Sequence, residues 1–191
     1  MSRICYGQCD FVFSDRAPWP SLPDRQGYSL VLINPAANPV LSEPSSWRTS
    51  KTLGGSPGDS DTSDLASFAA NQGIANPYAD HDFDGLATII EYATGSPHDS
   101  PSSPKILDAR VERSAEANHI VLDFPVAPGA DDIDLTPELS RDLSSWIAVA
   151  EAFVFLGESR LPDGRATRRY RVSEPFDPGD EIYFRLRATP R

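Results

Sequence analysis

Long apolar runs and basic residues are what this sequence most clearly lacks. No apolar stretch approaches the roughly 20 residues that a helix needs to span a bilayer. The first residues show neither the basic start nor the apolar run of a signal peptide. The formal net charge is -11, whereas binding to phosphate backbones requires clustered Lys and Arg. The sequence therefore predicts no membrane span and no nucleic-acid partner.

The shortage of positive charge is greatest in the middle of the chain. Residues 61–104 contain seven Asp or Glu residues and no Lys or Arg. Residues 1–60 are balanced, with five basic and five acidic residues, and residues 105–191 carry 12 basic and 16 acidic residues. The carboxylates of the middle segment therefore have no basic side chain of their own segment to neutralise them.

Cysteine and histidine are also scarce, with two and three residues respectively. Cys5 and Cys9 would lie about 13 Å apart on one extended strand, too far for a disulfide, although a tight turn between them would allow one. Free thiols and a bridge therefore both stay open. His81, His98 and His119 lie in different segments, and no Ser or Cys has the surroundings of an activated nucleophile. We expect no enzymatic activity.

Short strands and turns account for most of the rest. The 18 Pro and 12 Gly residues favour turns over long helices. Alternating apolar and polar residues in "HIVLDF" (119–124) and "EIYFRLRA" (181–188) predict half-buried strands. Further strands are predicted at 28–33, 105–113, 131–138, 147–156 and 165–173. The fold class is therefore predicted to be mainly β, with a small antiparallel β-sandwich made of the last six strands.

Two linkers rich in Gly, Ser, Asp and Pro divide the chain into three expected parts. The first is a β domain at 1–58 and the third is the sandwich at 105–191. The middle part, 59–104, contains two short predicted helices at 64–72 and 86–94. Ser63 or Asp64 is the expected N-cap of the first helix, and Gly73 and Gly95 are the expected stops.

The acidic stretch "DHDFDGLATIIE", residues 80–91, matches the twelve-residue calcium loop of the EF-hand type. Such a loop needs oxygen ligands at positions 1, 3, 5, 7, 9 and 12 and a glycine at position 6, which is Gly85 here. The predicted calcium ligands are Asp80, Asp82, Asp84, the backbone carbonyl of Leu86, Thr88 directly or through water, and Glu91.

A solvated acidic loop is the alternative to a calcium site. Three carboxylates within five residues repel one another unless a cation lies between them, and the segment supplies no basic residue. We therefore predict that the loop binds Ca²⁺, with Glu91 chelating through both oxygens. A single loop favours a structural role over a sensor, because sensors usually pair two such loops.

Three stretches resemble known families. The stretch "NPYADHDFDGLATIIEYATG" resembles the single thrombospondin type 3-like or dockerin-like calcium repeat of large secreted bacterial proteins. In residues 1–58, "FSDRAPWP", "YSLVLI", "SSWRTS" and "GGSPG" resemble the closing half of a bacterial lamin-tail domain, an immunoglobulin-like sandwich. The stretches "DLSSWIAV" and "YFRLRA" resemble the C-terminal sandwich that often follows such a repeat.

The resemblance implies a non-catalytic, calcium-binding structural or interaction module from the C-terminal end of a secreted or cell-surface protein. It also implies that the chain is truncated at its N-terminus and that the calcium loop rigidifies the junction between two β domains. Surface proteins or glycans are the implied partners. The alternative function is an accessory glycan- or protein-binding module of an exported enzyme. That alternative predicts an exposed Trp146 in line with its strand neighbours, whereas Trp19, Trp47 and Trp146 would otherwise be core residues.

Overall fold

The computed structural model describes residues 12–24, 26–101, 105–113, 117–160, 165–177 and 179–191. Cys5 and Cys9 lie outside the described residues. The predicted fold class is confirmed, because the described chain is mainly β and its strands form antiparallel sheets. The strands are β1 (Leu30–Leu32), β2 (Trp47–Thr49), β3 (Asp108–Arg113), β4 (Asn118–Val126), β5 (Ile133–Ser140), β6 (Phe153–Arg160), β7 (Ala166–Val172) and β8 (Tyr183–Pro190).

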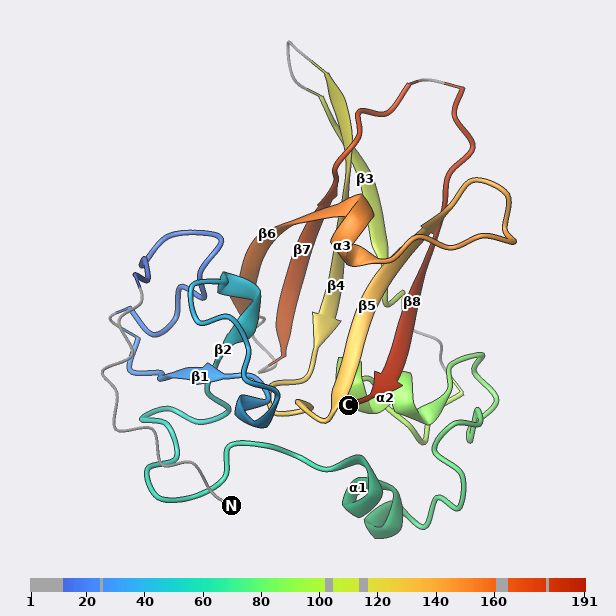
Figure 1. The fold of residues 1–191 in the computed structure, drawn as a ribbon. Coiled ribbons are helices and arrows are strands. Elements are labelled where there is room, and N and C mark those ends of the chain that lie inside the picture. Colours follow the sequence, from blue (N-terminus) through green and yellow to red (C-terminus); the bar gives the residue numbers. More distant parts are fainter. Residues whose placement is uncertain (1–11, 25, 102–104, 114–116, 161–164, 178) are drawn as a thin grey trace.

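The C-terminal strands form the two layers of a sandwich (Figure 1). One sheet has four strands in the order β3-β4-β7-β6, and the other pairs β5 with β8. The register joins Leu122 to Tyr170 between β4 and β7, and Leu135 to Ala188 between β5 and β8. The unequal widths of the two sheets leave part of the inner face of the wider sheet without an opposing strand.

The sandwich core follows the predicted alternation. Ile120, Leu122 and Phe124 of β4 are buried in the main hydrophobic cluster, and Phe184 and Leu186 of β8 pack against it. Burying this apolar surface is the main driving force for the fold. The prediction of a half-buried strand is incomplete for β4, because Val121 on its opposite face is fully buried as well. Its cross-strand neighbours are Arg110 and Arg171, whose long aliphatic stems can cover an apolar residue.

The strand predicted at 147–156 is partly wrong. Ile147 forms an isolated bridge to Leu139, the chain then makes the short helix α3 (Val149–Ala152), and β6 begins only at Phe153. The segment around α3 is rich in Ala, the residue with the highest intrinsic helix propensity. The helix propensity of these residues therefore interrupts the single strand that the apolar pattern predicted at 147–156.

The first described residues form a small unit beside the sandwich. β1 and β2 pair antiparallel, and two 3₁₀ helices, η1 (Pro35–Ala37) and η2 (Pro44–Ser46), lie between them. The strand predicted at 28–33 is thus confirmed in a shorter form. Arg160 of β6 donates hydrogen bonds to the carbonyls of Ser50 and Lys51 and lies over the Tyr28 ring. Residues 1–58 therefore contact the sandwich directly.

Helices α1 (Leu65–Gln72) and α2 (Thr88–Thr94) confirm the two predicted helices. Asp64 is the N-cap of α1, accepting from the backbone N–H of Ser67, and α2 begins two residues later than predicted because Leu86 and Ala87 still belong to the loop. Leu65 of α1 and Ile89, Tyr92 and Ala93 of α2 join the same hydrophobic cluster as the sandwich strands. Among the described helices, none is long and apolar enough to cross a membrane.

Candidate metal centre

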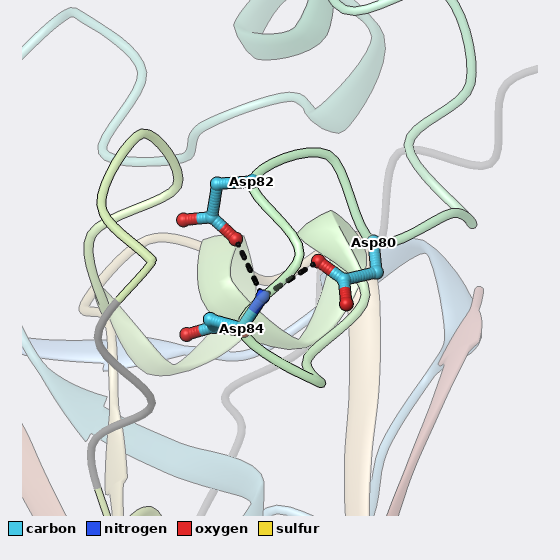
Figure 2. A group of neighbouring side chains, drawn as sticks. All are labelled: Asp80, Asp82 and Asp84. Carbon is cyan, nitrogen blue, oxygen red and sulfur yellow. Dashed lines mark hydrogen bonds between the residues drawn. The ribbon is translucent and has the colours of Figure 1, made fainter.

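Asp80, Asp82 and Asp84 come together in the loop between α1 and α2. One carboxylate oxygen from each lies within 4.8 Å of those of the others. Figure 2 shows the three side chains around the backbone nitrogen of Asp84, which donates to Asp80 Oδ1 and Asp82 Oδ1. Two oxygens that each bind one calcium ion at about 2.3–2.6 Å can be no more than about 5 Å apart. The spacing of the three aspartates therefore suits a single cation.

The backbone of the loop holds these carboxylates in place. Asp80 accepts from the N–H groups of Phe83 and Asp84 through Oδ1 and from that of Gly85 through Oδ2. Gly85 has φ of 97°, which explains the glycine predicted at this position, and Phe83 also has a positive φ of 64°. A left-handed conformation is rare for a bulky residue. No feature of the sequence indicates this conformation at Phe83, which is 89% exposed.

Glu91 lies in the first turn of α2 and is fully buried. Both of its carboxylate oxygens lack a hydrogen-bond partner, as do the buried Thr88 Oγ1 and Asp84 Oδ2. Buried polar atoms in folded proteins are normally paired, and an unpaired buried carboxylate is costly. These unpaired atoms all belong to residues that were predicted from the sequence as ligands. Their lack of partners within the described chain is what a missing cation would explain.

The electrostatics of the loop agree with this geometry. Burial, together with the charges of Asp82, Asp84 and Asp80, raises the pKa of Glu91 to about 7, and the neighbouring Thr88 hydroxyl opposes this rise only in part. The Glu91 carboxylate is therefore close enough to the three aspartates to feel their repulsion. It is not part of the compact group of three, so Glu91 or the loop has to move to bring all four carboxylates onto one ion.

Contacts outside the loop fix its two ends. The N–H groups of Thr88 and Ile89 donate to the carbonyls of Ala79 and Pro77, which closes the loop at its base. The N–H of Ser100 donates to Asp82 Oδ2 from the following linker. This contact joins residues 18 positions apart and had no signal in the sequence.

Asp132 connects both helices to the sandwich. Its carboxylate accepts from the N–H of Leu65 at the start of α1, at 2.7 Å, and from the Tyr92 hydroxyl on α2, at 2.8 Å. Its carbonyl accepts from the N–H of Arg191 after β8. The rings of Phe68 and Tyr92 pack with centroids 5.2 Å apart, so α1 and α2 also contact each other. Sequence reasoning did not find Asp132.

The structure places the other predicted residues as follows. Leu86 lies at the end of the loop, where its N–H donates to Asp84 Oδ1; its carbonyl stays a predicted ligand. His81 is exposed, as a residue at the second loop position should be. The donor set consists of oxygen atoms alone, which is the preference of calcium and magnesium and not of zinc. The residues present therefore fit the predicted calcium ion.

The tryptophans do not form an exposed platform. Trp19 is buried, and Trp47 is half-buried, with its indole N–H donating to the Leu41 carbonyl. Trp146 is half-buried, and the Arg185 guanidinium lies 4.0 Å above its ring. The exposed row of aromatic residues that would have favoured the alternative function is therefore absent at Trp146.

Comparison with protein-family models, with curated proteins and with solved structures finds no match.

Proposed function

We propose that this chain is a non-catalytic, calcium-binding structural module of a secreted or cell-surface protein. The observation that carries the proposal is Glu91, a fully buried carboxylate without a hydrogen-bond partner, beside three clustered aspartates. An acidic cluster on its own could be solvated, but a buried carboxylate cannot be. A divalent cation resolves both the repulsion and the unpaired oxygens.

The side chains of Asp80, Asp82 and Asp84 would hold the ion from the loop, and Glu91 and Thr88 would hold it from α2. The Leu86 carbonyl supplies the remaining predicted ligand. When bound, the ion supplies two positive charges that the segment 61–104 does not have. The loop N–H groups that donate to Asp80 orient its carboxylate before any ion arrives.

Helix α2 links the loop to the core of the protein. Thr88 and Glu91 carry buried oxygens without a hydrogen-bond partner, while Ile89, Tyr92 and Ala93 pack in the hydrophobic cluster with strands of the sandwich. A seven-residue helix is marginal in water without tertiary support. Repulsion at Glu91 would loosen α2, so cation binding at Glu91 should stabilise the packing of Tyr92 and its neighbours.

The proposed role is therefore to rigidify the junction between the two β regions. The loop and helices lie between residues 1–58 and the sandwich in the chain, and Asp132 ties both helices to β5 and β8. The direct contacts of Arg160 with residues 28–51 support the same junction independently of the loop. Extracellular calcium modules typically bind with dissociation constants of about 0.1–1 mM, which suits a permanently occupied structural ion outside the cell.

Calcium titration by isothermal calorimetry tests the proposal. We expect one ion per chain, at least tenfold weaker binding for Glu91→Gln and for Asp80→Ala, and unchanged binding for His81→Ala. The His81 variant is a matched control because it lies in the same loop and is exposed. No calcium binding to the intact chain, or an equal loss in all three variants, would contradict the site.

Hydrogen exchange tests the structural role separately. Calcium should slow amide exchange in residues 65–72 and 86–94 far more than in β4 and β7 of the central sheet. If calcium binds but changes protection nowhere outside the loop, the ion is bound without stabilising the junction.

A further inference from the structure

A second candidate site lies on the open side of the sandwich, away from the acidic loop. The sheet β5-β8 has two strands and faces a sheet of four, so the inner faces of β6 and β7 extend beyond β5. Helix η2 lies against β6 at this side. The result is a cleft of about 400 Å³, lined on its rim by Glu43, Ser45, Asp134, Thr136 and Arg191. This volume lies within the range of small-molecule sites, about 300–1,000 Å³.

The floor of the cleft is aromatic and rigid. Phe153, Phe155 and Tyr170 line it. The rings of Phe155 and Tyr170 have centroids 5.2 Å apart, and Tyr170 stacks on Phe124 in the core with an interplanar angle of 3°. Tyr170 and Phe153 are almost completely buried. Phe155, which is half-buried, is therefore the ring that the cleft exposes, and Tyr170 and Phe153 hold it in place.

The rim carries paired charges. Arg191 donates to Asp134 at 3.1 Å, and their side chains are 25% and 51% exposed. Deeper in, Arg168 pairs with Glu158 at 3.3 Å. Glu43 is exposed and adds one more negative charge. Both arginines in the cleft already have carboxylate partners, so an anionic ligand would meet no unneutralised positive charge and would be repelled by Glu43.

A peptide strand added to the edge of β5 is also a poor fit. The reciprocal bonds between Leu139 and Ile147 show that Leu139 points its backbone groups to the free edge of β5. Pro137, two residues before it, points the same way and has no N–H to donate. Leu135, the next such residue, is 4% exposed. The edge is thus blocked where the cleft lies.

We propose that this cleft binds a neutral saccharide, one sugar ring of which lies on Phe155 at the floor. A sugar ring has an apolar face of C–H groups for the aromatic floor and hydroxyls that both donate and accept. Adjacent hydroxyls match the donor of Arg191 and the acceptor of Asp134, which stand side by side at the rim. The hydroxyls of Ser45 and Thr136 provide further partners on opposite sides of the cleft.

Nuclear magnetic resonance of the ¹⁵N-labelled chain in saturating calcium tests this site. The probes are glucose, galactose, mannose and cellobiose, each added to about 100 mM, which detects dissociation constants of millimolar order. We expect at least one of them to shift the amide resonances of residues 134–136, 153–155 and 168–170 progressively. The same titration in EDTA shows whether the cleft depends on the metal loop.

Two variants should remove the binding while leaving the core intact. Ser45→Trp places a large ring in the cleft from an exposed position, and Asp134→Asn removes the acceptor charge at the rim. Each should weaken binding about tenfold or more. The matched controls are Ser60→Trp and Asp177→Asn, which change exposed residues elsewhere and should bind as the parent does.

The absence of localised shifts with all four sugars would overturn the proposal, as would equal weakening by the control variants. Shifts in the same residues with inorganic phosphate but with none of the sugars would also overturn it, because they would identify an anion site. Calcium binding by calorimetry is independent of this result, so failure of the cleft and failure of the metal loop are distinguishable.

Discussion

Two clusters of acidic residues in this protein each contain one buried carboxylate, Asp131 in one and Glu91 in the other, and they are built in opposite ways. Around Arg48, the chain supplies its own cation: the guanidinium, 3% exposed, binds Asp131 through Nε and Nη2 and Asp61 through Nη1. Around Glu91, the described residues supply no cation, and buried oxygens stay unpaired. A buried carboxylate thus takes its cation from the chain at Asp131, whereas Glu91 requires a cation from outside the described chain.

The pKa values express the same contrast. Burial alone would raise the pKa of Asp61, but hydrogen bonds from Arg48, from the Lys51 N–H and from Ser56 outweigh it and lower that pKa. At Glu91 burial and neighbouring charges act together, and the pKa rises to about 7. A carboxylate with its own arginine stays charged, whereas one without a cation tends to take up a proton.

The largest effect is expected when the internal cation is removed. Arg48→Met should lower the free energy of unfolding by about 3–5 kcal/mol, because it leaves the buried Asp131 and the partly buried Asp61 without their partner. Urea denaturation measures this, and calcium should not restore the loss. The exposed ion pair of Lys105 with Asp108 provides the control: Lys105→Met should change stability by about 0.5 kcal/mol or less. If Arg48→Met and Lys105→Met lower the free energy of unfolding equally, burial does not determine how much these ion pairs contribute to stability.

Removal of the external cation should have the next largest effect. With a dissociation constant of about 0.1 mM, 10 mM calcium stabilises the folded state by about 2.7 kcal/mol. EDTA should therefore lower the melting temperature by several degrees relative to calcium, as measured by differential scanning calorimetry. Identical melting temperatures in calcium and EDTA would mean that the carboxylates around Glu91 do not need an external cation.

The pH dependence of the metal-free protein should follow Glu91. Its folded-state pKa, about 7, lies above the ordinary value of 4.5, so between these values the folded state binds more protons than the unfolded state. The contribution of Glu91 should therefore make stability fall as pH rises from about 4.5 to 7, by roughly 1–3 kcal/mol. Denaturation in EDTA at several pH values measures this change.

Glu91→Gln is the control for that pH series. The neutral amide should abolish the fall in stability between about pH 4.5 and 7. In EDTA at pH 7.5 the variant should therefore be more stable than the parent, although it loses its stabilisation by calcium. A parent and a variant with parallel pH profiles would show that Glu91 does not titrate near neutral pH.

A smaller effect is expected at the link between α2 and the sandwich. Tyr92→Phe removes the hydroxyl that donates to Asp132 and keeps the ring, so it should cost about 0.5–1.5 kcal/mol. If the junction is coupled to the ion, calcium affinity measured by calorimetry should fall slightly as well. A loss of stability with no change in calcium affinity would mean that the contact of α2 with Asp132 stabilises the fold but does not affect calcium binding by the loop.

The smallest effect, and one of opposite sign, is expected at Phe83. Its positive φ of 64° is unfavourable for a bulky residue, and its ring is 89% exposed. Phe83→Gly should therefore relieve strain without losing packing and should stabilise the calcium-bound protein by up to about 1 kcal/mol. His81→Gly, a neighbouring exposed position with no positive φ in the structure, should not stabilise.

The sequence determined the local features of this protein. Alternation of polar and apolar residues located most strands, because each strand needs only its own residues to present an apolar face. Asp64, Gly73 and Gly95 marked helix ends through backbone chemistry that is equally local. The three clustered aspartates were recognisable for the same reason: their spacing along the chain brings them close in any compact loop.

The tertiary structure alone decided how these features are connected. The burial of Glu91, the bonds of Asp132 to both helices, and the choice of Arg48 as the cation for Asp61 and Asp131 join residues that are far apart in sequence. The partner of Arg48, Asp131, is 83 positions away. The cleft beside β5 depends on the unequal widths of two sheets. Burial and pairing at such distances follow from how whole layers pack, and no local pattern of residues encodes them.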